Sequence, residues 1–175
     1  MKFLTNIFIP NLMSIAFTQI NMKPEMTTFI VKHSSSLTTL SLLASLNQCN
    51  IFLILSRCTR LKSLTFSFGH SIPLCISHPT VMNISITNIF RDLEKITKKL
   101  QPKLDCFTSE DPISFPSLQE IHLHGFHHSI LYNLDRSMAQ HSYWSFILRK
   151  CISRCITIYD EMECPVYVDE IYFGQ

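Results

Sequence analysis

The feature that most constrains this chain is a recurring spacing of apolar residues, L-x-x-L-x-L, in which other apolar residues replace some of the leucines. Successive copies start 25, 24, 20, 37 and 50 residues apart, which indicates an internal repeat. The six copies are Leu12/Ile15/Phe17, Leu37/Leu40/Leu42, Leu61/Leu64/Phe66, Val81/Ile84/Ile86, Leu118/Ile121/Leu123 and Val168/Ile171/Phe173.

The spacing predicts a strand in each copy, because residues two apart in a strand point to the same face. One strand with one helix cannot bury its apolar side, whereas stacked copies share a continuous core. We therefore expect an α/β fold, a leucine-rich-repeat solenoid. Short parallel strands would form its concave face, helices its convex face, and the C-terminal repeat would be irregular. The alternative is an ordinary α/β domain with a non-repeating strand order.

The length of 175 residues fits one domain, and we expect it to span residues 1–175 with about six or seven repeats. The interval of 37 residues is interpreted as containing a degenerate copy near Leu104 and Phe107, and the interval of 50 as two periods. Apolar helical segments are predicted between the strands, at residues 29–33, 53–58, 96–100 and 144–155.

Charge and composition exclude several classes of function. A net charge of +2 is too small to indicate a nucleic acid or an acidic membrane as partner. No apolar run is long enough for a transmembrane helix. The seven cysteines are odd in number and form no CxxC pair, so we expect buried thiols and a reducing compartment, cytoplasmic or nuclear.

The candidates for chemistry are few. His122, His124, His127 and His128 form a cluster in which the first two would point the same way on a strand, as zinc ligands can. No CxxC or HExxH motif accompanies them, so exposed positions beside a core strand are the favoured interpretation. Cys151 and Cys155 have the spacing of one helix face, and we expect them to pack in the core.

No GxSxG, P-loop or GxGxxG motif occurs. We therefore predict a protein that is not an enzyme, without catalytic residues, cofactors or metal ligands. An enzyme of unfamiliar type is the alternative.

A binding surface follows from the strand alternation, because residues between the core positions would face the concave side. This column is rich in hydroxyl groups and nearly uncharged, so its partner's footprint should be polar and only mildly salt-sensitive. The predicted partner-binding residues are Ser14, Thr39, Ser41, Ser63, Thr65, Asn83, Ser85, Glu120, His122 and His124.

Three sequence segments, residues 36–43, 56–64 and 115–121, resemble those of a known family. They resemble the leucine-rich-repeat region of fungal F-box-like proteins, and the phrase around Cys58 is similar to the cysteine-containing class of repeat. The resemblance implies a protein-interaction module that recognises substrates for an F-box/cullin–RING ubiquitin ligase.

The chain departs from that family because we find no F-box before Leu12, so a ligase adaptor would be a partner only if an F-box is encoded upstream. Apolar residues around Phe3 and Phe8 lack a polar cap, and we expect a longer architecture. The alternative is a truncated or degenerate repeat fragment without an active role.

Overall fold

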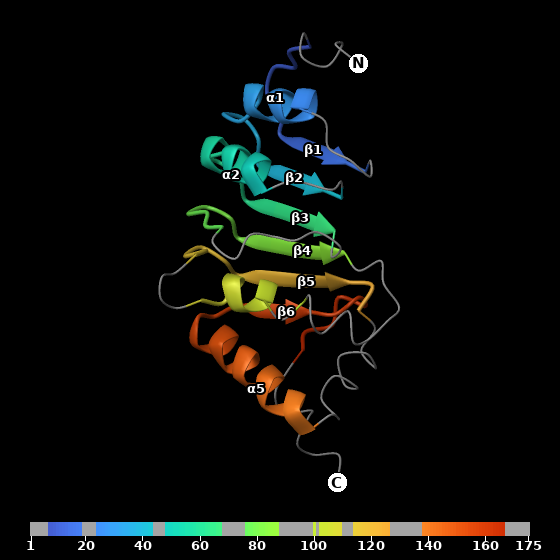
Figure 1. The fold of residues 1–175 in the computed structure, drawn as a ribbon, viewed down its shortest axis with the longest axis vertical. Coiled ribbons are helices and arrows are strands. Elements are labelled where there is room, and N and C mark those ends of the chain that lie inside the picture. The colour runs from blue at the N-terminus through green and yellow to red at the C-terminus, as the bar shows by residue number, and fades with distance from the viewer. Residues whose placement is uncertain are drawn as a thin grey trace.

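The computed structural model describes residues 7–18, 24–43, 48–67, 76–87, 100, 102–109, 114–126 and 138–166. In these ranges six strands form one parallel sheet, and every strand lies beside its neighbours in sequence (Figure 1). The strands are β1 (Ser14–Phe17), β2 (Thr39–Leu42), β3 (Ser63–Ser67), β4 (Asn83–Thr87), β5 (Glu120–His124) and β6 (Thr157–Tyr159).

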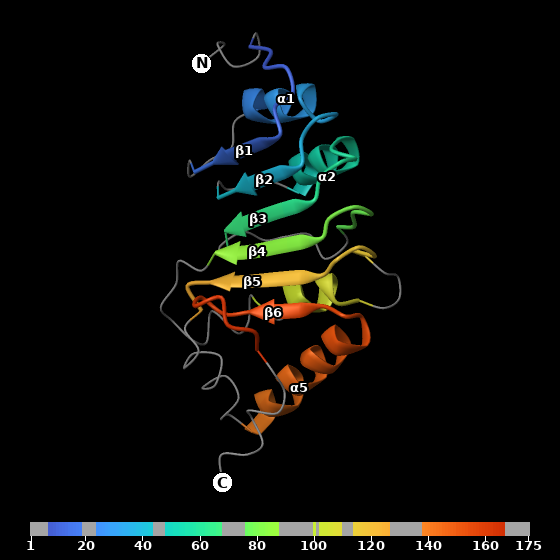
Figure 2. The same cartoon turned by 180° about the vertical axis from the view of Figure 1, so that it is seen from behind.

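The described helices lie on one side of this sheet. They are α1 (Pro24–Lys32), α2 (Gln48–Arg57), α5 (Met138–Ser153) and a helical segment at 102–107. Figure 2 shows the opposite side, on which the strands lie in front of the helical segment. None of the described helices combines the length and the apolar run that crossing a bilayer requires.

The core lies between the sheet and these helices. One central column joins all six strands, since the register pairs Ile15 with Leu40, Leu40 with Leu64, Leu64 with Ile84, Ile84 with Ile121 and Ile121 with Ile158. All six side chains are buried, and burial of an aliphatic side chain contributes roughly 1.5–3 kcal/mol. The prediction of an α/β protein with a parallel sheet is confirmed, and Leu40, Leu64, Ile84 and Ile121 are lateral neighbours as the spacing requires.

One backbone hydrogen-bond pattern repeats where each strand begins. In each case the acceptor is the carbonyl of the residue that precedes a strand. The two donors are the N–H group of the first residue of the next strand and the N–H group of the residue that precedes that strand. These carbonyls, with their donors, are Met13 (Thr38, Thr39), Thr38 (Lys62, Ser63), Lys62 (Met82, Asn83) and Met82 (Gln119, Glu120), at 2.8–3.1 Å. The strands therefore align by the same local geometry at four successive junctions.

Hydroxyl groups add a second connection that the sequence analysis did not predict. The residue before the first apolar position of a copy donates its hydroxyl to a carbonyl of the preceding copy. Ser36 donates to Leu12 at 2.9 Å, Thr80 to Leu61 at 2.8 Å, and Ser117 to Pro79 at 2.6 Å. Arg60 occupies the same place before Leu61 and has no hydroxyl to offer.

Two expectations about the C-terminal part need correction. The degenerate copy near Leu104 and Phe107 is wrong, because 102–107 is helical and β4 pairs directly with β5. Both side chains are buried in the core, which explains their strand-like apolar pattern. The sixth strand is residues 157–159, which the spacing did not predict, and the copy expected at 168–173 lies outside the described residues.

The end of α5 explains why the last strand begins where it does. Cys155 has a φ of 55°, the left-handed conformation that usually favours glycine. The N–H of Ile156 bonds to the Cys151 carbonyl at 2.8 Å, and the N–H of Cys155 to the Ile152 carbonyl at 3.1 Å. These bonds form a Schellman motif that stops the helix and turns the chain into β6.

Candidate functional site

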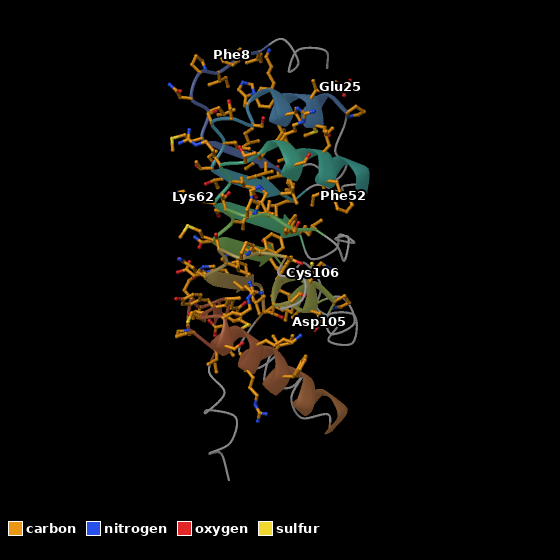
Figure 3. All side chains as sticks on the ribbon, turned by 90° about the vertical axis from the view of Figure 1, so that its left-hand side faces the viewer. Phe8, Glu25, Phe52, Lys62, Asp105 and Cys106 are labelled. Atoms are coloured by element: carbon orange, nitrogen blue, oxygen red, sulfur yellow. The ribbon has the colours of Figure 1, made fainter. Side chains whose placement is uncertain are left out.

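The candidate site is the face of the sheet opposite the helices, which Figure 3 shows in profile. Two in-register columns of side chains cross it, because residues that alternate with the core positions point away from the helices. The first column is Ser14, Thr39, Ser63, Asn83, Glu120 and Thr157; the second is Ala16, Ser41, Thr65, Ser85, His122 and Tyr159.

The ten predicted partner-binding residues all lie on this face. Nine lie in the two columns, and His124 follows His122 by two residues on β5. None of the ten is buried. Over β1–β4 they are hydroxyl or amide side chains, so this part of the face can exchange hydrogen bonds and carries no charge of its own at these positions.

At the β5 and β6 end the face also carries ionisable and aromatic side chains, which we call the His122 corner: Glu120, His122 and His124 on β5, Tyr159 on β6, and Glu163 in the turn after β6. The His122 ring stacks on Tyr159, with centroids 4.8 Å apart, and on His124 at 6.0 Å. Its Nδ1 lies 2.8 Å from Glu163 Oε2, and its Nε2 lies 3.3 Å from Glu120 Oε2. The prediction that His122 and His124 point the same way agrees with this geometry, whereas His127 and His128 lie outside the described residues.

Glu163 reaches the corner from the turn that follows β6. The Asp160 side chain holds this turn by accepting the N–H groups of Met162 and Cys164, both at 2.9 Å. The Val166 N–H then bonds to the Ile158 carbonyl at 2.8 Å, so the chain returns along β6. Glu163 itself has a φ of 56°, and this unusual conformation for a non-glycine residue costs about 1 kcal/mol or more.

The amide of Asn83 extends the corner toward β4. With its nitrogen oriented toward acceptors, it donates to Glu120 Oε2 at 3.3 Å and to the Met82 carbonyl at 3.0 Å. Glu120 therefore contacts both a neutral donor and His122. A carboxylate can accept several such bonds, so the two contacts are compatible.

A metal centre is not supported by this arrangement. Among the described residues, no group of three or more histidine, cysteine, aspartate or glutamate side chains has the geometry to hold a metal ion. The sequence also contains a basic stretch, Arg91, Lys95, Lys98 and Lys99, and a single tryptophan, Trp144; the stretch and the Trp144 side chain lie outside the described part of the chain. The His122 corner is therefore the most ionisable part of the site that the structure places.

Two buried histidines lie on the helix side and have structural partners. His33 Nδ1 lies 2.8 Å from the Phe29 carbonyl, and its Nε2 accepts the N–H of Ile9 at 3.0 Å. His78 donates from Nε2 to the Cys58 carbonyl at 3.0 Å, and burial lowers the pKa of His78, although this hydrogen bond opposes the shift. Both rings satisfy backbone groups, which indicates a role in folding rather than chemistry.

The cysteine pair predicted for one helix face is separated by the helix end. Cys151 is buried on α5, whereas Cys155 lies beyond the helix and is exposed, so the prediction of core packing is wrong for Cys155. Both line an apolar hollow of about 300 Å³ between α5 and β6. Burial raises the pKa of Cys151 to about 12, so this thiol is a poor nucleophile.

Comparisons with known proteins give no relative: no family model, curated protein or solved structure matches this chain.

Proposed function

We propose that this chain is a leucine-rich-repeat solenoid that binds another protein through the exposed face of its parallel sheet. The observation that carries the proposal is the register, which places chemically equivalent positions of six strands in continuous columns. Stacked repeats of this kind present extended surfaces that suit protein partners. The hydroxyl-rich columns of β1–β4 would supply hydrogen bonds, and the His122 corner would supply charge.

The experiment is a binding assay with variants of the face. Ser41→Arg combined with Thr65→Arg places two long cations in the middle of one column, where steric and charge conflict should reduce partner binding at least about tenfold. A matched control, Ser35→Arg with Ser77→Arg, adds the same charge at two exposed positions outside the strands. Equal loss of binding in both double variants, with both folded, would contradict the proposal.

The narrower form of the proposal is substrate recognition for an F-box/cullin–RING ligase. It is supported by the resemblance of residues 36–43, 56–64 and 115–121, and it requires an F-box encoded upstream. Affinity purification of the product of the complete transcript tests it. Recovery of a ligase adaptor with that product, and not with residues 1–175 alone, is the expected result.

A reducing compartment, cytoplasmic or nuclear, belongs to the same proposal. Five cysteines whose side chains the structure describes form no disulfide, and three of them are buried. Buried thiols that act as small hydrophobic side chains fit such a compartment. Fluorescence microscopy of the tagged full transcript product tests the location.

A further inference from the structure

The two edges of the parallel sheet are not alike. Among the described residues, β1 pairs with β2 alone, and β6 is the strand at the opposite end (Figure 2). At β6 the chain covers its own edge, because the Val166 N–H bonds to the Ile158 carbonyl at 2.8 Å and an antiparallel bridge joins Pro165 to Tyr159. No described residue covers the outer edge of β1 in this way.

The backbone groups that face the outer edge of β1 are those of Ser14 and Ala16. The carbonyls of Met13 and Phe17 point toward β2, where they accept N–H groups. Because successive residues of a strand direct their backbone groups to opposite sides, Ser14 and Ala16 point outward. The residues equivalent to Ser14 on β2 to β6 each donate their N–H group toward the preceding strand; they are Thr39, Ser63, Asn83, Glu120 and Thr157. The edge of β1 therefore repeats the donor pattern of the other strands.

The core positions of the first copy are less covered than their equivalents along the sheet. Leu12 and Phe17 are half-buried, and Ile15 is 7% exposed. The matching residues of the next three copies are all 0% exposed. Met13, which precedes β1, is 60% exposed. The apolar core thus extends to the outer edge of β1, and one more strand there would bury it further.

The segment that forms this edge carries no charge. Residues 7–18 contain no aspartate, glutamate, lysine or arginine. Proteins usually protect an edge strand with charged side chains or with a covering segment, because an exposed edge can pair with another chain. Among the described residues β1 has neither protection, so its edge accepts an added strand without a conflict of charge.

We propose that the outer edge of β1 binds an extended segment of another protein, which adds a parallel strand to the sheet. The choice of a strand follows from continuity with the described sheet, in which every neighbouring pair is parallel and joins equivalent positions. A carbonyl of the added segment accepts the Ser14 N–H, and its alternate apolar side chains cover Ile15 and Phe17. This site goes beyond the proposed function, which uses side chains of the exposed face, and either can fail without the other.

The test uses a synthetic peptide of residues 60–67 as the probe, because it carries the apolar spacing of a copy and two basic side chains that keep it soluble. Its binding to the full chain is measured by fluorescence anisotropy. In β3 the Lys62 carbonyl faces the next strand, so the Leu64 N–H faces the same way and the Thr65 N–H faces away. N-methylation at Leu64 should therefore weaken binding at least about tenfold, whereas N-methylation at Thr65, the matched control, should change it less than about twofold.

A variant of the chain locates the site. Ala16→Pro removes an N–H group that points outward and keeps the bonds to β2, and proline is tolerated on an edge strand at such a position. We expect peptide binding to weaken at least about tenfold, whereas Ala16→Ser, which keeps the N–H group, should bind within about twofold of the unmodified chain. Amide exchange of Ser14 and Ala16 should slow when the peptide is added.

Several results would overturn the proposal: equal binding of the two methylated peptides, undiminished binding to Ala16→Pro, or no binding at a peptide concentration of about 1 mM, where even a weak complex forms. Sedimentation of the unmodified chain alone tests a different occupant. A dimer that Ala16→Pro dissociates would assign the edge to a second copy of this chain and not to another protein. If Ala16→Pro does not fold, the two methylated peptides with the unmodified chain decide the question.

Discussion

The first four strands and the last two are built by different means, although they belong to one sheet. Strands β1 to β4 start 25, 24 and 20 residues apart and are joined by repeated backbone and hydroxyl hydrogen bonds. Strands β5 and β6 each start 37 residues after the strand before them. Strand β5 keeps the repeated backbone bonds to β4, but the last two strands also depend on contacts of particular side chains, above all Arg154 and Asp160.

This difference shows that the pairing register of neighbouring strands does not depend on the number of residues between them. The Met82 carbonyl still accepts the N–H groups of Gln119 and Glu120, although the interval has grown from 20 to 37 residues. The sheet thus fixes a few residues at the start of each strand, and extra length is accommodated elsewhere. The exposed face changes with the interval, since small hydroxyls give way to the His122 corner.

The largest effect that tests this comparison is expected from the substitution Arg154→Met. The Arg154 guanidinium donates to the carbonyls of Phe107 and Ser109, both at 3.0 Å, and of Phe115 at 2.6 Å. These bonds join the end of α5 to the segments before β5. Without the guanidinium, three partly buried carbonyls lose their hydrogen-bond donor. We therefore expect the free energy of unfolding to fall by about 3 kcal/mol.

The measurement is urea denaturation, and the matched control is Arg149→Met on the same helix. Arg149 is exposed, so its replacement should change stability by less than about 0.5 kcal/mol. A comparable loss in the two variants would show that the C-terminal strands do not depend on the three carbonyl contacts.

The second test concerns the pH dependence of stability, to which the buried His78, between β3 and β4, should contribute. Burial lowers the pKa of His78 in the folded state below its usual 6.5, so the unfolded chain binds the proton more readily. The contribution of His78 to stability is complete above pH 6.5 and is lost as the pH falls toward the lowered value. For one proton the slope cannot exceed about 1.4 kcal/mol per pH unit.

Chemical denaturation of the unmodified chain and of His78→Gln across this range measures the contribution of His78. His78→Gln should flatten the loss of stability on acidification. A steeper loss in His78→Gln would contradict the assignment of a neutral, buried ring.

A smaller effect is expected from Cys155→Gly at the end of α5. The residue has a φ of 55° and an exposed side chain, so glycine removes the steric cost of the left-handed conformation and little packing. We expect a gain of about 1 kcal/mol in the free energy of unfolding. Cys164→Gly, at another exposed cysteine without a positive φ in this structure, is the control and should lower stability; a gain of equal size there would remove the helix-end explanation.

The smallest effect is expected from Arg60→Ser. Residue 60 occupies the position at which Ser36 and Thr80 donate a hydroxyl to the preceding copy. By the same geometry the hydroxyl that this substitution introduces would face the Leu37 carbonyl, and we expect a gain of about 0.5 kcal/mol. Thermal melting measures it, and Arg60→Ala is the control because it removes the same charge without adding a donor. Equal melting temperatures in the two variants would show that the hydroxyl connection adds nothing at this junction.

Much of the sheet was predictable because its apolar spacing is local. Leu64 and Ile84 define their strands from residues within the same copy, and their lateral pairing follows from the alignment of copies. Strand β6 was missed because it is three residues long and has only Ile158 buried within it. The helical segment around Leu104 has an apolar spacing that fits either a strand or a helix. It is too short for the sequence alone to decide between them.

The candidate site, like the sheet, could be predicted from the sequence only in part. The exposed hydroxyls and His122 follow from strand alternation, which any predicted strand supplies. Tyr159 belongs to the strand that was missed, and Glu163 lies 41 residues from His122 in sequence. No spacing rule connects residues that meet only because a turn after β6 returns over the sheet.

Each of the six described strands pairs, within the sheet, only with its neighbours in sequence, and a sheet of that order needs no chain crossing during its assembly. Each new strand can be added to the edge formed by the last, so the mean loop that must be closed stays near one repeat. Such a chain can gain a copy by duplication without disturbing existing pairs. The added copy must offer a backbone carbonyl directly before its strand, the position that Met13, Thr38, Lys62 and Met82 occupy before the existing strands.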